Sequence, residues 1–253
     1  KAIIKTIANL KGILDSRAQR MDIIKSELRE IQEQYGDERR TEIVPVDSDF
    51  SMEDMIAEEE VVLTITHQGY IKRTALNTYR TQRRGGRGVQ GAMSKDEDFV
   101  EHLFIANTHN YMLFFTDMGK CYWLKVYDIP QGGRAARGRA IVNLIGCDPG
   151  ERVEAFVSVK DFDDDHYIVM CTKNGIVKKT VLSAYGNPRK GGIYAIDIRD
   201  NDKLIEARIT NGEHDILLGT HEGKSIRFSE NNIRPSGRKT MGVKGITLSS
   251  SDD

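Results

Sequence analysis

The sequence has 253 residues, of which 39% are hydrophobic and 30% charged, and 37 lysines and arginines nearly balance 38 aspartates and glutamates. This length holds one or two domains. No run of 18 apolar residues occurs, and the first residues lack the order of a signal peptide, so we expect a cytoplasmic protein without membrane contact. The three cysteines form no CxxC pair, which argues against a zinc site or a disulfide framework. Because Lys1 opens a helical pattern, we expect a piece of a longer protein.

The near-zero net charge hides a strong segregation of charge along the chain. Residues 47–60 carry seven acidic side chains and no basic one, whereas residues 61–95 carry seven basic side chains and no acidic one. Segregated charge creates local fields, and such fields decide which partners bind.

Residues 1–35 have the periodicity of two helices. Apolar side chains follow one another at spacings of three and four in two series, Ile3, Ile7, Leu10 and Leu14, then Met21, Ile24, Leu28, Ile31 and Tyr35. Ser16 is the predicted N-cap of the second helix and Gly36 its predicted end. The pattern indicates the end of a coiled coil, or a helical cap on the next domain. We expect residues 1–44 to be helical, 45–60 to be an acidic connector and 61–253 to form one β domain.

The β domain is predicted from a unit that occurs four times. Each unit has a short β-branched or aromatic strand, a Thr-x-x-Gly turn, a second strand, a glycine-rich basic turn and an acidic patch before a last strand. The threonines are Thr66, Thr116, Thr172 and Thr220, which lie 50, 56 and 48 residues apart. This period predicts a mainly β, propeller-like array of four-stranded blades. The fourth unit is incomplete, so we expect an open arc or missing blades.

No pattern in the sequence predicts a catalytic or metal site. Five of the six histidines occupy equivalent loop positions of the repeat, for which a structural role is the simpler interpretation. No ligand spacing and no nucleophile–base pair is present. We therefore expect no catalytic residue, metal or cofactor in this chain.

The basic half of the unit recurs at equivalent positions, which predicts a positive belt on a curved array. Such a belt suits duplex DNA, because phosphate contacts give affinity without reading sequence. The alternative is a mixed surface that only maintains solubility. The predicted contacts are Lys72, Arg73, Arg134, Arg137, Arg139, Lys178, Lys179, Arg189, Lys190, Lys224, Arg227, Arg238 and Lys239.

The strongest single signal is the heptad Gln82-Arg83-Arg84-Gly85-Gly86-Arg87-Gly88. Guanidinium forks match phosphate oxygens, and glycines allow positive φ and a close approach of the backbone, so we expect an exposed basic turn suited to an anionic polymer. The alternative for the heptad alone is a solvated glycine-rich hairpin loop whose charges only maintain solubility. The heptad resembles the box in the C-terminal domain of the A subunit of DNA gyrase, a bacterial type IIA topoisomerase. That box usually reads Gln-Arg-Arg-Gly-Gly-Lys-Gly, and Arg87 replaces its lysine. Residues 35–43 resemble the junction after the coiled coil of that family.

The resemblance implies a strand-swapped, six-bladed β-pinwheel, of which four units are present here. It implies that duplex DNA wraps right-handedly around the rim, with residues 82–88 required for wrapping. The holoenzyme would contain the gyrase B subunit and a second A subunit, would use ATP and Mg²⁺, and would introduce negative supercoils. The catalytic tyrosine, metal site and ATPase of the family are not matched. Two alternatives stay open: the related topoisomerase IV subunit, which is expected to lack an intact box, and a propeller-like protein-interaction scaffold.

Overall fold

The structure is a computed structural model that describes residues 1–37, 41, 52–79, 81–88 and 98–249. It divides into two units, Lys1–Phe50 and Ser51–Asp253. This division lies inside the expected connector, residues 45–60. Residues 45–51 of that connector, Asp96, Glu97 and residues 251–253 of the predicted acidic patches lie outside the described part.

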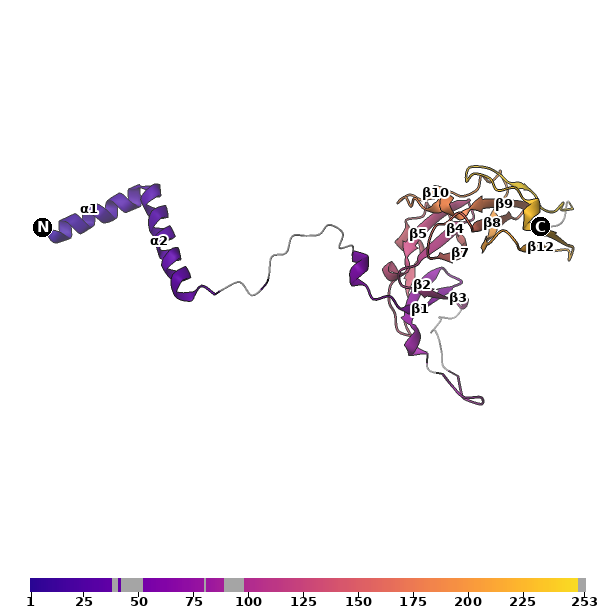
Figure 1. Cartoon of the computed structure of the whole chain (residues 1–253), viewed down its shortest axis with the longest axis horizontal. Helices are drawn as coiled ribbons and strands as arrows, with labels where there is room; N and C mark the ends of the chain where they lie inside the picture. The colour runs from indigo at the N-terminus through magenta and orange to yellow at the C-terminus, as the bar shows by residue number, and fades with distance from the viewer. Residues whose placement is uncertain (38–40, 42–51, 80, 89–97, 250–253) are drawn as a thin grey trace. The chain divides into compact units, whose positions relative to one another are not determined.

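The first unit consists of the two predicted helices, α1 (Ala2–Asp15) and α2 (Arg17–Tyr35) (Figure 1). The Ser16 side chain accepts a hydrogen bond from the Gln19 N–H at 3.4 Å, which caps α2, and Gly36 ends that helix. Both predicted helix boundaries are confirmed. The apolar side chains of the two series are exposed, and their pairing in a coiled coil stays a prediction.

The second unit contains three four-stranded antiparallel sheets and one hairpin. Each repeat supplies three strands to its own sheet: β1 (Glu60–Thr66), β2 (Tyr70–Ala75) and β3 (Val100–Asn107) in the first, β4 (Tyr111–Thr116), β5 (Lys120–Lys125) and β7 (Val153–Val159) in the second, and β8 (Tyr167–Thr172), β9 (Ile176–Val181) and β11 (Leu204–Thr210) in the third. The fourth repeat supplies the hairpin β12 (Asp215–Gly219) and β13 (Ser225–Ser229). The described chain also contains η1 (Met52–Met55), η2 (Leu76–Thr78), η3 (Val126–Asp128), α3 (Val142–Ile145), η4 (Leu182–Tyr185) and η5 (Glu230–Asn232).

The fourth strand of each sheet comes from the following repeat. The strands β6 (Arg139–Ala140), β10 (Ile193–Tyr194) and β14 (Val243–Lys244) pair with β2, β5 and β9 respectively. Each of these strands lies at the sheet edge opposite to β3, β7 or β11. The structure therefore shows the predicted four-stranded blades and the strand exchange that the resemblance implies.

Each Thr-x-x-Gly turn is closed by its own threonine. The hydroxyl of Thr66 accepts the N–H of Tyr70 at 3.2 Å, and those of Thr116, Thr172 and Thr220 accept the equivalent N–H groups at 3.2, 3.3 and 3.2 Å. The glycine of each turn has φ between 75° and 82°, a region that side chains with a Cβ rarely adopt. The repeated threonines and glycines are therefore explained by hairpin geometry.

The core lies between successive sheets. One cluster of buried side chains joins the first two sheets, with Leu63, Ile71 and Phe114 among its members, and a second cluster, which includes Phe115 and Met170, joins the second and third. Figure 1 shows these sheets following one another along an arc, with β5 and β10 toward its outside and β7 toward its inside. The exchanged strand β10 thus lies on the outer side of the arc.

Candidate nucleic-acid interface

The basic residues of the repeat are concentrated in four turns, here called the basic turns: residues 82–88, 133–139, 189–192 and 237–240. The first three are closed by a backbone hydrogen bond, from the N–H of Gly86, Ala136 or Gly192 to the carbonyl three residues earlier, at 2.9 to 3.0 Å. In the fourth, the Thr240 hydroxyl donates to the Gly237 carbonyl at 2.8 Å. The second turn runs into β6, the third leads directly into β10, and the fourth comes shortly before β14.

The first basic turn is the heptad at residues 82–88, and all seven of its residues are exposed. Gly85 and Gly88 have φ values of 86° and 71°, which places both in the left-handed region. The Gln82 side-chain oxygen accepts the Gly88 N–H at 2.9 Å, so this glutamine closes the loop that presents the arginines. Figure 1 shows residues 81–88 projecting from the first sheet. The expected exposed turn is present, and its contact with DNA stays a prediction.

Lys72 does not lie on the expected basic surface. Its side chain is 2% exposed, and its ammonium donates to the carbonyls of Gly133, Arg134 and Ala136 at 3.2, 2.7 and 2.9 Å. Burial lowers the pKa of this lysine. The expectation that Lys72 contacts DNA is corrected, because its donors already hold the second basic turn.

Lys178 and Lys179 require the same correction. Lys178 is fully buried and donates to the carbonyls of Ala195 and Arg238, and burial, assisted by the Arg238 charge, lowers its pKa to about 8. Lys179 is buried beside Glu230, with its ammonium 3.1 Å from a carboxylate oxygen and 4.2 Å from the centre of the Tyr167 ring. Glu230 also accepts the Thr210 hydroxyl and the His214 N–H, each at 2.7 Å. Both lysines connect neighbouring repeats.

Four further predicted contacts are engaged within the protein. The half-buried Arg73 donates from Nε to the Ile129 carbonyl at 2.7 Å. Arg137 stacks on the Tyr70 ring, with its Cζ 3.7 Å from the ring centre, and donates to Gln68. The remaining two, Arg227 and Lys224, are exposed but form ion pairs with Asp215 and Glu222. These side chains are less available to an external anion than the sequence indicates.

The remaining predicted cations keep their charge directed at solvent. Eight exposed side chains of the basic turns make no ion pair or side-chain hydrogen bond within the described part of the chain: Arg83, Arg84, Arg87, Arg134, Arg139, Arg189, Lys190 and Lys239. Arg238 is half-buried. The structure thus moves the candidate interface from the strands to the turns.

The sequence analysis did not identify the buried residues that contact these turns from inside the protein. In the second repeat, Tyr122 takes the position of Lys72 and Lys178, and a Cβ on Gly192 would lie 2.8 Å from its ring. These three residues each follow the turn glycine by three positions, so a register comparison could have identified them. Adjacent residues of a strand face opposite sides, which means that Lys72-Arg73 and Lys178-Lys179 cannot both point outward.

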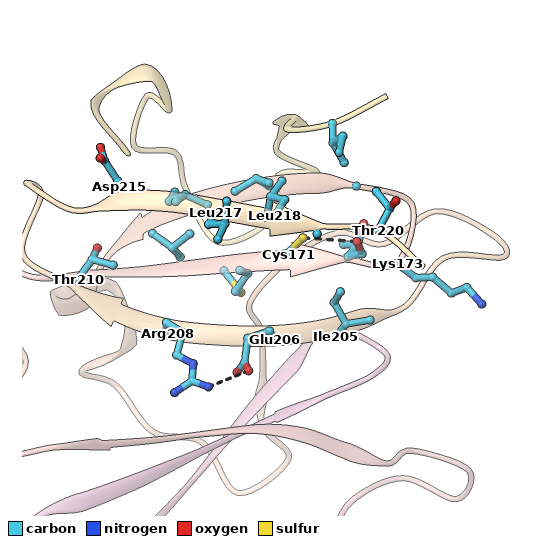
Figure 2. Close-up of a pocket in the computed structure, with 18 of the residues that line it drawn as sticks. Cys171, Lys173, Ile205, Glu206, Arg208, Thr210, Asp215, Leu217, Leu218 and Thr220 are labelled. Atoms are coloured by element: carbon cyan, nitrogen blue, oxygen red, sulfur yellow. Dashed lines mark hydrogen bonds and ion pairs between the residues drawn. The ribbon is translucent and has the colours of Figure 1, made fainter. Parts of the chain in front are cut away.

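A groove of different chemistry lies between the third sheet and the hairpin of the fourth repeat. It has a volume of about 450 Å³ and is lined mainly by apolar side chains of β8, β11 and β12. Figure 2 shows Leu217 and Leu218 of β12 near Cys171 of β8, while the charged end of Lys173 points away. Its lining includes Lys173 and Arg208, but Arg208 is paired with Glu206 at 3.1 Å, and none of its lining residues belongs to the basic turns.

Two further searches concern the described residues alone. No group of three or more His, Cys, Asp and Glu side chains in this part of the chain is placed to hold a metal ion. No helix there combines the length and the apolar character needed to cross a membrane.

One protein-family model matches most of this chain. The model of the DNA gyrase C-terminal domain, described as a beta-propeller, matches residues 60–107, 110–160, 166–211 and 214–253. These four segments coincide with the four repeats.

Curated relatives at 43–51% identity carry the name of the DNA gyrase A subunit. The relative from Clostridium acetobutylicum is 51% identical over 243 residues, which are 96% of this chain and 29% of the relative. The relative from Haemophilus influenzae is 44% identical over 99% of this chain and 28% of the relative. The chain thus spans about three tenths of the length of these relatives.

Two solved structures share the fold. The C-terminal domain of DNA topoisomerase IV superposes with a TM-score of 0.67 at 32% identity, covering 78% of this chain and 60% of that one. The DNA gyrase A C-terminal domain superposes with a TM-score of 0.61 at 26% identity, covering 77% and 62%. The topoisomerase IV alternative is less supported than gyrase, because the curated relatives at 43–51% identity are gyrase A subunits.

Proposed function

Because the chain belongs to the DNA gyrase C-terminal domain family, we propose that it binds duplex DNA through its basic turns and wraps the duplex along the outer side of the arc. The observation that carries this proposal is the set of eight exposed turn cations that have no protein partner among the described residues. Arginine and lysine bind phosphate oxygens without reading bases, which suits an interface for DNA of any sequence.

Placement of the cations on repeated turns supports wrapping in particular. Bending 20–30 base pairs by 40–90° costs roughly 1–6 kcal/mol, so contacts must be spread along the bend to offset the cost. The exchanged strands put a basic turn at the same edge of successive sheets, which distributes charge along the array. A single basic patch would hold DNA without bending it.

Within a holoenzyme, we propose that this module presents wrapped DNA to a catalytic core for strand passage. That core would comprise the rest of the gyrase A subunit, a second copy of it and the gyrase B subunit, with ATP and Mg²⁺, and the result would be negative supercoiling in the bacterial cytoplasm. The support is the shared family and the relatives named as gyrase A subunits. The role of this chain's residues in that reaction is to bind and orient DNA.

Salt dependence of duplex binding tests the proposal. If the eight free turn cations each neutralise one phosphate, log K should fall against log[salt] with a slope of about −7. Replacing Arg83, Arg84 and Arg87 with alanine should weaken binding and reduce the slope by about 3. The measurement is fluorescence anisotropy of a labelled duplex over a series of salt concentrations.

The matched control removes three exposed cations that lie outside the basic turns, Lys160, Arg208 and Arg227. Arg208 and Arg227 already pair with Glu206 and Asp215, so their loss should change the slope little. Equal effects of the two triple variants would show that bulk charge, not the turns, binds DNA. Weak binding with a flat salt dependence would instead favour the protein-interaction scaffold.

A further inference from the structure

Two buried lysines sit directly beneath basic turns of the following repeat. The Lys72 ammonium contacts three carbonyls of residues 133–136, and the Lys178 ammonium contacts one carbonyl in the fourth turn and the Ala195 carbonyl. In each case the lysine belongs to the sheet that receives the exchanged strand.

Burial of an ammonium ion is costly unless its donors are satisfied. An ammonium has three N–H donors, and Lys72 makes three hydrogen bonds to carbonyls of one turn. Carbonyls that converge on a buried cation point into the protein, which leaves Arg134, on the same turn, exposed to solvent. The lysine therefore fixes which way the turn faces.

Further contacts from the same strand hold the segment that leads into the second turn. The Arg73 N–H donates to the Pro130 carbonyl at 3.0 Å, and the Thr74 hydroxyl donates to the Gly132 carbonyl at 3.0 Å. The Lys179 carbonyl accepts the Ser236 N–H at 2.9 Å before the fourth turn. These contacts place the segment, while the buried ammonium holds the turn itself or its entry into the strand.

We propose that Lys72 and Lys178 are positioning residues of the DNA interface, which hold the second and fourth basic turns so that Arg134 and Lys239 face the phosphate backbone. This inference rests on the proposed function. It assigns two lysines that touch no DNA a role in DNA affinity, through the geometry of a turn some 60 residues further along the chain.

A double-mutant cycle in DNA affinity tests the inference. The variants are Lys72→Met, Arg134→Ala and their double, measured with the whole chain and a labelled duplex. If Lys72 acts through the second turn, Lys72→Met should lower affinity by the factor found for Arg134→Ala, and the double variant should lose little more. The cycle of Lys178→Met with Lys239→Ala should behave in the same way.

The control combines substitutions that act on different turns, such as Lys72→Met with Lys239→Ala. The factors by which these two substitutions lower DNA affinity should multiply within about twofold, as expected of independent sites. A lysine that only stabilises the fold would give the same multiplicative result with every partner, including Arg134, and would overturn the inference. If Lys72→Met does not fold, the cycle of Lys178→Met with Lys239→Ala tests whether the buried lysine acts through its turn.

Failure of the inference and failure of the proposed function differ in outcome. If Arg134→Ala and Lys239→Ala weaken binding while both lysine variants bind like wild type, the positioning role is overturned and DNA binding stands. If neither Arg134→Ala nor Lys239→Ala changes affinity, the positioning inference is overturned, whereas the proposed function is judged separately by the salt slope of the whole chain and of the Arg83, Arg84 and Arg87 variant.

Discussion

At the residue scale, two kinds of lysine and arginine serve this protein. Those in the strands, such as Lys72, Lys178 and Lys179, are buried and satisfied by carbonyls or a carboxylate. Those at the turn tips, such as Arg83 and Arg189, are exposed and lack a protein partner among the described residues. A count of charges cannot separate the two kinds, since both raise the local basic content.

The buried charge of Lys178 predicts a pH-dependent stability. Its pKa is lowered to about 8 in the folded protein, whereas an unfolded lysine keeps its proton up to about 10.4. Between these values the unfolded chain binds more protons, so this group makes folding more favourable as pH rises. Relative to Lys178→Met, wild type should gain about 1.5 kcal/mol in the free energy of unfolding between pH 8 and 9.5.

Urea unfolding of both proteins across that pH range measures the difference. Other titrating groups are shared by the two proteins and cancel in the comparison. A difference that stays constant with pH would show that the ammonium of Lys178 is not held in the low-polarity site described above.

At the element scale, the exchanged strand couples each turn to the preceding sheet. Gly138 has a φ of 90°, and a Cβ there would lie 2.4 Å from the Ile71 carbonyl oxygen. This glycine is therefore required both by its backbone conformation and by the close approach of β6 to β2. Gly138 lies in the second basic turn directly before β6, so it connects this turn to the strand that pairs with the first sheet.

Replacing Gly138 with alanine should destabilise the protein more than the same replacement at a positive-φ glycine that lies in open space. Gly146 is the matched control, since its φ is 63° and a Cβ there meets no atom within 4 Å. Gly146→Ala should cost roughly 1 kcal/mol for the left-handed backbone, and Gly138→Ala roughly 3 kcal/mol because β6 must also move. Urea unfolding measures both, and equal costs would argue against a tight junction between β6 and β2.

The elements themselves could be predicted from the sequence with good success. Ser16 and Gly36 bound α2 as expected, and the four Thr-x-x-Gly turns mark hairpins because both residues have local roles in turn geometry. The exposure of residues 82–88 also follows from local composition. Local chemistry of this kind is visible in a sequence.

The burial of the strand lysines could not be predicted in the same way. Lys72 is buried because carbonyls some 60 residues further on accept its hydrogen bonds, and those partners are brought near by strand exchange. Repetition of charge shows that equivalent positions share an environment, but not whether that environment is solvent or core. Strand alternation would have required one residue of each basic pair to point inward.

At the scale of the whole molecule, the repeat places a basic turn in each unit, and under the proposed function these turns together form one extended interface. Three sheets joined by exchanged strands hold successive basic turns at equivalent edges, and the clusters of buried side chains between the sheets fix their spacing. If the turns bind DNA as proposed, affinity is distributed over many weak phosphate contacts, which would make it salt-sensitive and tolerant of DNA sequence. A stiff duplex would then have to follow the curve of the array to reach all of the turns.

Ligation of a nicked DNA circle in the presence of the chain tests wrapping most directly. A right-handed wrap constrains positive writhe, so sealing the nick and then removing the protein should leave topoisomers with a raised linking number. We predict this shift for wild type and its loss for the Arg83→Ala, Arg84→Ala, Arg87→Ala variant, whereas the control variant of Lys160, Arg208 and Arg227 should keep it. An unchanged linking number under saturating wild-type protein would contradict the account.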